Sequence, residues 1–438
     1  MIVWRKRRDM NTAEAQRHLA AAQQARQRGD VTGATRLFEN ALAADPANPH
    51  AHNALGMIAL DANDPAAAET RFRAAAAADP TEPALWLNVA KAQRLRGDGD
   101  GELASLDAAL AIDQRHFMAL LRKAELLERM ERRGAAAQSW GGVVLLAEQA
   151  GELPRGIADA VAHGRGYVAA HAQALGAAMA DGLEQARAAL DARELRRFDA
   201  CVETMLGKRR VYRNECHGVY FPFLPPDEFF DRTHFAWMPA IEAQTGAIRD
   251  EFRALIAGEG APLRPYVAQA SGTPANKWTP LDNSLAWGAM FLWEYGVRDD
   301  ALCARCPVTA AALDAVPRAD IPGRGPTAFF SILEPKTTIP PHTGVTNVRA
   351  IVHLPLIVPE GCTFRVGGET RSWREGEAFA FDDTIEHEAV NDSDQRRAVL
   401  IFDTWNPHLS EAECTLIRTM FAVGDASSLA PDERGAGL

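Results

Sequence analysis

The sequence predicts two domains of different class: an α-helical solenoid of repeats, then a C-terminal double-stranded β-helix of the jelly-roll or cupin-like type. The length of 438 residues exceeds what one hydrophobic core usually covers, so at least two domains are expected. The first third repeats with a period of 34 residues, which indicates stacked helical units. The last third consists of short apolar runs separated by Pro, Gly and Asp, which indicates successive antiparallel strands.

Composition and charge narrow the classes of function. With 47% hydrophobic and 24% charged residues, the chain can bury cores along most of its length. A net charge of −11 argues against general binding to nucleic acid or to anionic membranes. The basic residues 1–8 are not followed by the apolar stretch of a signal peptide or a membrane span, and six scattered cysteines suit a reducing compartment. We therefore expect a cytoplasmic protein without a membrane span.

The 34-residue period rests on several residue types at a common offset. Asp45, Asp79 and Asp113 form one series, and Pro46 and Pro80 another. Turn-forming and small residues share the spacing, in Gly29-Asp30, Asn63-Asp64 and Gly97-Asp98, and in Ala22, Gly56, Ala90 and Ala124. Two helices joined at such a turn cannot bury their apolar face alone, so stacked neighbours must cover it. We expect this domain over residues 11–150, with units that begin near Ala15, Pro49, Pro83 and Phe117.

This pattern resembles the tetratricopeptide repeat. A generic alanine-rich bundle would account for the helices but not for their common offset. The resemblance implies a concave groove that binds a peptide or an extended protein segment. Self-association is the alternative use of such a groove, and the oligomeric state is left open.

The rest of the chain divides into a spacer and a domain that is expected to carry the chemistry. Residues 151–210 have apolar residues at helical spacing and are expected to form a helical spacer. Residues 211–425 begin with a cluster of aromatic residues and prolines and continue into the strand-like runs. Cys303 and Cys306 form a CxxC pair, but no second pair or HxxxH completes a zinc site, so coincidence or a local structural role is expected.

Three polar residues stand at the ends of the expected strands. His342 ends one strand, His387 follows another strand 45 residues later, and Arg397 precedes the apolar run 398–402. Imidazole suits Fe(II), and a buried guanidinium suits the distal carboxylate of a 2-oxo acid. These are the parts of a 2-oxoglutarate oxygenase. Asp382 and Asp383 either accept a hydrogen bond from an imidazole or form a turn before His387.

The same region resembles the aspartyl/asparaginyl β-hydroxylase family. The matching residues run from Pro341-His342-Thr343-Gly344 through His353-Leu354, then include Glu386-His387-Glu388, Arg397 and Asp403-Thr404-Trp405. The resemblance implies that His342 and His387 are the iron ligands and that Arg397 clamps the cosubstrate carboxylate. It also implies that Trp287, Ser331 and His353 belong to the cosubstrate pocket.

Two positions near these residues set the chain apart from related enzymes. Gly344 lies two residues after the first histidine, where many oxygenases have a third, carboxylate ligand. The resembling family also has glycine there and works with two histidines, with water completing the iron sphere. Ile351, two residues after Arg349, stands where the family often has a second arginine, so substrate or cosubstrate contacts on that strand are expected to differ.

We therefore expect a dioxygenase that uses Fe(II), 2-oxoglutarate and O₂ to hydroxylate an unactivated carbon. The resemblance implies the β-carbon of Asp or Asn in a peptide or protein, which the repeats would recruit. A small-molecule or lipid substrate is an alternative, because similar folds act on such substrates. A non-catalytic binding module is a further alternative, against which the presence of His342, His387 and Arg397 argues.

Overall fold

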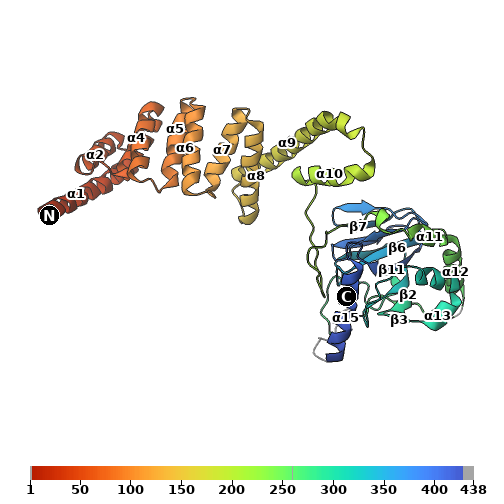
Figure 1. Ribbon diagram of the computed structural model, residues 1–438. Helices are drawn as coiled ribbons and strands as arrows, with labels where there is room; N and C mark the ends of the chain where they lie inside the picture. The colour runs from red at the N-terminus through yellow and green to blue at the C-terminus, as the bar shows by residue number, and fades with distance from the viewer. Residues whose placement is uncertain (1, 259, 428–438) are drawn as a thin grey trace. The chain divides into compact units, whose positions relative to one another are not determined.

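The chain divides into two compact units. The computed structural model describes residues 2–258 and 260–427, with side chains from residue 13 onward. The boundary lies between Leu206 and Gly207 (Figure 1). Within this part of the chain, no helix is both long enough and apolar enough to cross a membrane.

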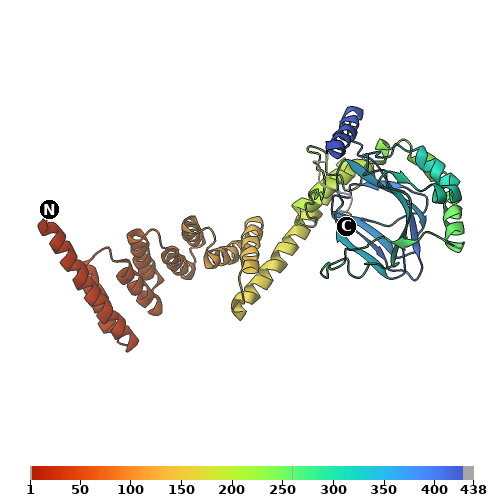
Figure 2. The same cartoon turned by 90° about the horizontal axis from the view of Figure 1, so that it is seen from below.

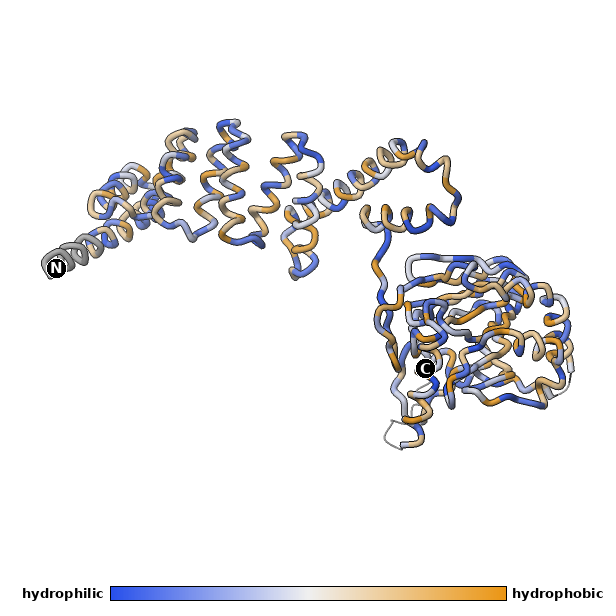
Figure 3. The backbone as a smooth tube through the Cα atoms, in the orientation of Figure 1, coloured by the Kyte–Doolittle hydropathy of each residue, from blue (hydrophilic) through white to orange (hydrophobic). Residues whose placement is uncertain are grey.

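The N-terminal unit is entirely helical. Hairpins α1–α2, α3–α4, α5–α6 and α7–α8 correspond to the four expected units, and each packs on the next, which confirms the repeat solenoid (Figures 1 and 2). Hydrophobic and hydrophilic residues alternate along these helices, as a stack with buried inner contacts requires (Figure 3). The helices are α1 (Ile2–Gln27), α2 (Val31–Ala44), α3 (Pro49–Asp61), α4 (Pro65–Ala78), α5 (Pro83–Leu95), α6 (Gly99–Ile112), α7 (Phe117–Arg129), α8 (Arg133–Gln149), α9 (Arg155–Arg187) and α10 (Ala192–Met205).

The turn inside each hairpin explains the repeated Gly/Asn-Asp pair. The first residue of the pair has a left-handed backbone, with φ of 77° at Gly29, 59° at Asn63 and 73° at Gly97. The aspartate that follows accepts a hydrogen bond from the N–H three residues later and so caps the second helix, at Asp30, Asp64 and Asp98. In the fourth unit Glu131 takes the left-handed position, with φ of 56°, and the next residue gives no side-chain cap.

The helices of this unit meet through small residues and through ion pairs. A Cβ added to Gly56 would lie 2.5 Å from the ring of Phe72, so only glycine allows this close crossing. Buried Glu102 pairs with Arg129 of the next hairpin at 3.0 Å. Within residues 151–210, the expected spacer, lie α9 and α10; a Cβ on Gly164 of α9 would lie 2.5 Å from Trp140 of α8. The start of α9 therefore extends the stack.

The C-terminal unit contains two antiparallel sheets, which confirms the expected β domain. The seven-stranded sheet has the order β1-β2-β4-β11-β6-β9 with β3 beside β2, and the four-stranded sheet has the order β5-β10-β7-β8. The strands are β1 (Arg264–Pro265), β2 (Trp287–Glu294), β3 (Val297–Arg298), β4 (Ala328–Leu333), β5 (Thr337–His342), β6 (Arg349–Ile357), β7 (Cys362–Val366), β8 (Glu369–Arg371), β9 (Phe379–Phe381), β10 (His387–Asn391) and β11 (Arg397–Trp405).

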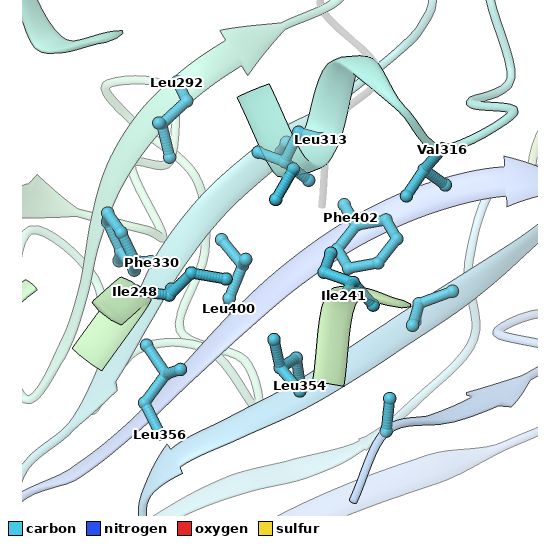
Figure 4. Close-up of a cluster of buried hydrophobic side chains, with 14 of the residues drawn as sticks. Ile241, Ile248, Leu292, Leu313, Val316, Phe330, Leu354, Leu356, Leu400 and Phe402 are labelled. Carbon is cyan, nitrogen blue, oxygen red and sulfur yellow. The ribbon is translucent and has the colours of Figure 1, made fainter. Parts of the chain in front are cut away.

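The two faces of the larger sheet have different partners. One face packs against α11 (Met238–Glu242), α12 (Thr245–Ala257), α13 (Asp300–Arg305) and α14 (Pro307–Asp314), in a core that includes Ile248, Leu292, Phe330, Leu400 and Phe402 (Figure 4). The other face meets the four-stranded sheet through a second apolar cluster. A last helix, α15 (Glu411–Ser427), follows β11.

The sequence suggests one helix over residues 241–257, but the structure has a break after Glu242. At this break the N–H of Gln244 bonds to the carbonyl of Ile241, three residues back, as in a turn and not as in an α-helix.

We expect Gly97→Ala to destabilise the N-terminal unit by about 1 kcal/mol, because a side chain disfavours the left-handed backbone of this turn. A Cβ at Gly97 would meet no atom within 4 Å, so the change tests backbone conformation alone. The measurement is urea unfolding followed by circular dichroism. Gly134→Ala, in α8 and equally open, is the control and should be neutral or stabilising by up to about 1 kcal/mol. Equal effects of the two changes would contradict this explanation of the turn.

Candidate active site

A cavity of about 580 Å³ lies against the inner face of the seven-stranded sheet. Its volume is in the range of about 300–1,000 Å³ that is usual for small-molecule sites. Antiparallel pairing aligns residues of neighbouring strands across the sheet. Leu333 of β4 lies between Trp287 of β2 and Arg397 of β11, and Ser331 lies two residues earlier in β4. The cavity is lined by all six residues that the sequence singles out: Trp287, Ser331, His342, His353, His387 and Arg397.

His342 and His387 come from neighbouring strands of the four-stranded sheet. They are register partners in the β5–β10 pair, and their ring centroids lie 4.0 Å apart. Nδ1 of His342 lies 2.8 Å from the carbonyl oxygen of Pro340, and Nδ1 of His387 lies 3.0 Å from that of Ile385. A carbonyl oxygen only accepts hydrogen bonds, so each Nδ1 carries the proton and each Nε2 keeps its lone pair. Both rings are thus in the tautomer that binds a metal through Nε2.

The surroundings of the two rings keep them neutral. The edge of Trp278 lies against His342, with centroids 5.0 Å apart, and Phe381 lies 5.2 Å from His387. Burial, with a smaller contribution from nearby Lys277, lowers the pKa of His342 to about 4. Burial also holds the pKa of His387 well below its usual range. Neutral imidazole is the metal-binding form, so these rings need lose no proton when a metal binds.

Arg397 is a buried cation without an anionic partner among the described residues. Its guanidinium lies 4.7 Å from the ring centroid of Trp373, and Nη1 donates to Ser331 Oγ at 3.3 Å. Nε is buried and has no hydrogen-bond partner in this part of the chain. Burial lowers the pKa of the group to about 10, which still leaves it charged at neutral pH. A buried charge normally needs a counter-ion, so the site suits a carboxylate ligand.

The neighbours of Arg397 add further donors. Ser331 Oγ accepts from Arg397 and from Trp287 Nε1, the latter at 3.2 Å, so its own O–H remains free to donate. His353 accepts from Trp373 Nε1 at its Nδ1, at 3.2 Å, which places the imidazole proton on Nε2. Burial and the charge of Arg397 hold the pKa of His353 well below its usual range.

Arg349 lies between two buried carboxylates at the far side of the cavity. Its Nη1 is 3.4 Å from Asp403 Oδ2, and its Nη2 is 4.0 Å from Asp383 Oδ2. Burial raises the pKa of Asp383 and of Asp403 to about 6, although Arg349 acts in the opposite direction. A Cβ added to Gly344 would lie 2.1 Å from Asp383 Oδ2. The Asp383 carboxylate therefore occupies the space that a third metal ligand at residue 344 would need.

Asp382 belongs to a turn and does not orient an imidazole. It accepts from the N–H and the hydroxyl of Thr384, at 3.0 and 2.6 Å, and from Asn214 at 2.7 Å. Both imidazoles bond to backbone carbonyls instead, so the turn is the correct reading for Asp382. Burial, more than nearby Asp383, raises the pKa of Asp382 to about 7.

The segment before the first helix of this unit forms part of the cavity wall. Glu215 donates its N–H to Thr384 O, and Gly218 donates to Val345 O, both at 2.8 Å. Thr346 Oγ1 donates to Val219 O at 2.6 Å. These bonds fasten residues 214–221 across the loops that follow β5 and β9, and residues 217–219 line the cavity.

The site fits an iron ion and a 2-oxo acid. In residues 2–258 and 260–427 no group of three or more His, Cys, Asp or Glu side chains is arranged to hold a metal, so the two Nε2 atoms would act as a pair. Imidazole nitrogen suits Fe(II), and the unpaired donors at Arg397 suit a carboxylate.

Comparison with known proteins agrees with this geometry. Residues 242–407 match the family described as aspartyl/asparaginyl beta-hydroxylase, and residues 25–92 match the tetratricopeptide repeat. The chain contains an aspartyl/asparaginyl β-hydroxylase family domain. All six cavity residues of the sequence prediction lie inside the range that matches this β-hydroxylase-family domain.

Several relatives share this domain. The human aspartyl/asparaginyl beta-hydroxylase is 39% identical over 125 residues, which cover 28% of this chain and 16% of that protein. The ornithine lipid ester-linked acyl 2-hydroxylase of Rhizobium tropici is 33% identical over 186 residues, which cover 42% of this chain and 62% of that protein. The rat aspartate beta-hydroxylase domain-containing protein 2 is 30% identical over 209 residues, which cover 47% and 58%. The chain therefore spans less than two thirds of each of these relatives.

Sequence reasoning missed several residues of the site. Trp373 follows a short strand as a lone aromatic residue, and nothing in its sequence context indicates that it contacts both His353 and Arg397. The cavity-lining residues 217–219 precede a proline-rich stretch that sequence alone treats as a lead-in. Tyr266 stacks on Trp287 with centroids 3.9 Å apart, and again only the fold brings the two rings together.

We expect the protein to bind one Fe(II) per chain, and His387→Ala to weaken that binding by more than about 100-fold. Removing a residue that only hydrogen-bonds to a metal ligand typically weakens metal binding by about 10- to 100-fold. His387→Ala removes one of the two proposed ligands themselves, so we expect a larger loss. Anaerobic equilibrium dialysis with Fe(II) measures stoichiometry and affinity. His408→Ala is the control, because His408 pairs with Asp227 and does not line the cavity. Unchanged iron binding in His387→Ala would show that the metal assignment is wrong.

Proposed function

We propose that the chain is an iron(II)- and 2-oxoglutarate-dependent dioxygenase that hydroxylates the β-carbon of Asp or Asn in a peptide or protein. The observation that carries this proposal is one cavity that holds two metal-ready imidazoles and a buried arginine without an anionic partner in the described residues. The match of residues 242–407 to the β-hydroxylase family supports it.

Each side chain has a part in this proposal. His342 and His387 hold the metal through Nε2, while the carbonyls of Pro340 and Ile385 fix their orientation. Arg397 and Ser331 hold the distal carboxylate of 2-oxoglutarate. When bound, iron, 2-oxoglutarate and O₂ supply the oxidising chemistry: one oxygen atom enters succinate, the other enters the product hydroxyl, and CO₂ is released.

The repeats would bring the substrate to the domain. Tetratricopeptide-type solenoids offer a concave surface for extended peptides, and residues 25–92 match this repeat. The six cysteines are all unpaired, which suits a reducing compartment, and we place the protein in the cytoplasm.

A lipid acyl chain is the second candidate substrate. The observation in its favour is the likeness to the ornithine lipid hydroxylase, which this chain matches over 62% of that protein's length. Succinate formation that is stimulated by acyl lipids and not by peptides would favour this candidate.

The first test is uncoupled turnover of 2-oxoglutarate to succinate with iron and ascorbate, combined with the variant Arg397→Lys. We expect turnover in the wild type and a rise of roughly ten- to a hundredfold in the apparent 2-oxoglutarate constant of the variant, because an ammonium cannot reproduce the two parallel donors of guanidinium. Anaerobic titration of 2-oxoglutarate, followed by the charge-transfer band, separates binding from turnover. Arg396→Lys is the matched control, since Arg396 pairs with Glu334 at the surface. Equal affinities, or no turnover in the wild type, would contradict the proposal.

The second test removes residues 1–206, the N-terminal unit. Separate cores should tolerate this cut, so we expect unchanged 2-oxoglutarate turnover but weaker hydroxylation of proteins in a cell extract. Mass spectrometry measures the oxygen added to Asp and Asn residues. The same set of products at the same rates would show that the repeats do not recruit the substrate.

A further inference from the structure

Most of the arginines that line the cavity are paired with carboxylates of the chain. Four arginines line it. Three of these face carboxylates: Arg264 pairs with Glu294, Arg324 with Asp425, and Arg349 with Asp383 and Asp403. Among the residues that the structure describes, Arg397 is the one cavity-lining arginine or lysine without a carboxylate partner, and the proposed function assigns it to 2-oxoglutarate.

The corner around Arg349 has an excess of negative charge. One guanidinium faces two carboxylates, so the group carries a net negative charge when both are ionised. Oδ1 of Asp383 and Oδ1 of Asp403 are buried without a hydrogen-bond partner in the described chain. Burial raises the pKa of both carboxyls to about 6, although Arg349 acts in the opposite direction.

Ile351 puts an apolar side chain at the position of β6 where a second arginine would face the cavity. The residues of β6 that line the cavity are Arg349, Ile351 and His353. Ile351 is the register partner of Asp403 on one side and of Phe381 on the other. An arginine here, as the resembling family often has, would lie beside Asp403; isoleucine leaves this part of the cavity apolar.

We propose that the group accepted beside 2-oxoglutarate is uncharged, so that the chain acts on asparagine and not on aspartate residues. This inference rests on the proposed function, because it specifies the substrate of the same site. An aspartate carboxylate would lose water in the cavity, find no arginine or lysine among the described lining residues without a carboxylate partner apart from Arg397, and approach two carboxylates. The asparagine carboxamide has nearly the same shape and no net charge, and its NH₂ group is a donor that carboxylate oxygens can accept.

The test compares two blocked single residues as probes, N-acetyl-L-asparagine N-methylamide and N-acetyl-L-aspartate N-methylamide. The full chain is loaded with 2-oxoglutarate and with Zn(II), a redox-inert substitute for iron, and ligand-observed NMR at pH 7.5 gives both dissociation constants. We expect the asparagine probe to bind at least about tenfold more tightly, because like charges brought together are strongly disfavoured. Equal affinities, tighter binding of the aspartate probe, or no binding of either probe would overturn the inference.

Two substitutions at one position sharpen the test. Ile351→Arg should raise the affinity for the aspartate probe by about tenfold or more, since it adds a cation beside Asp403. Ile351→Met keeps the position apolar and should leave the wild-type preference unchanged. The wild-type ratio stands even if the arginine variant fails to fold. Binding of 2-oxoglutarate in the same samples tests the proposed function separately: its absence would refute that function, whereas its presence without a preference for asparagine would refute this inference alone.

Discussion

The antiparallel pairing of β5 with β10 is the interaction on which the rest of the site depends. It makes His342 and His387 register partners although 45 residues separate them in the chain. A shift of one residue in this register would turn one imidazole to the opposite face of the sheet. The backbone carbonyls of Pro340 and Ile385 then fix both tautomers, so the geometry of the proposed metal ligands depends on the sheet and not on further polar side chains.

Several ionisable side chains of the cavity are buried without a full set of charged or hydrogen-bonding partners. Burial keeps His342 and His387 neutral and raises the pKa of the carboxyls of Asp383 and Asp403 to about 6, while Arg397 is buried without a counter-ion among the described residues. Such groups reduce stability when considered alone. The seven-stranded sheet, which carries Arg397 and Asp403, packs against an apolar cluster on each face. In the proposed function, binding of a metal and a carboxylate ligand would offset this cost.

Gly344 and Asp383 show how the site excludes a third protein ligand. The carboxylate of Asp383 fills the space beside Gly344, and Arg349 holds that carboxylate from the other side. A side chain at residue 344 would displace Asp383 and disturb its pairing with Arg349. The same contact therefore links the proposed metal-binding side of the cavity to the charges around Arg349.

The sequence by itself determined the features that are local or periodic. The left-handed residue and the capping aspartate of each repeat turn are neighbours in the chain, so their common offset predicted the solenoid and its units. Strand texture predicted the β domain, and the resemblance named six residues that the fold then brought to one cavity. Only the tertiary structure decided what depends on long-range pairing: the contact of Trp373 with Arg397, the wall formed by residues 217–219, and the two carboxylates around Arg349. These contacts join segments that are tens of residues apart, and they arise from strand register and burial, which no local sequence pattern encodes.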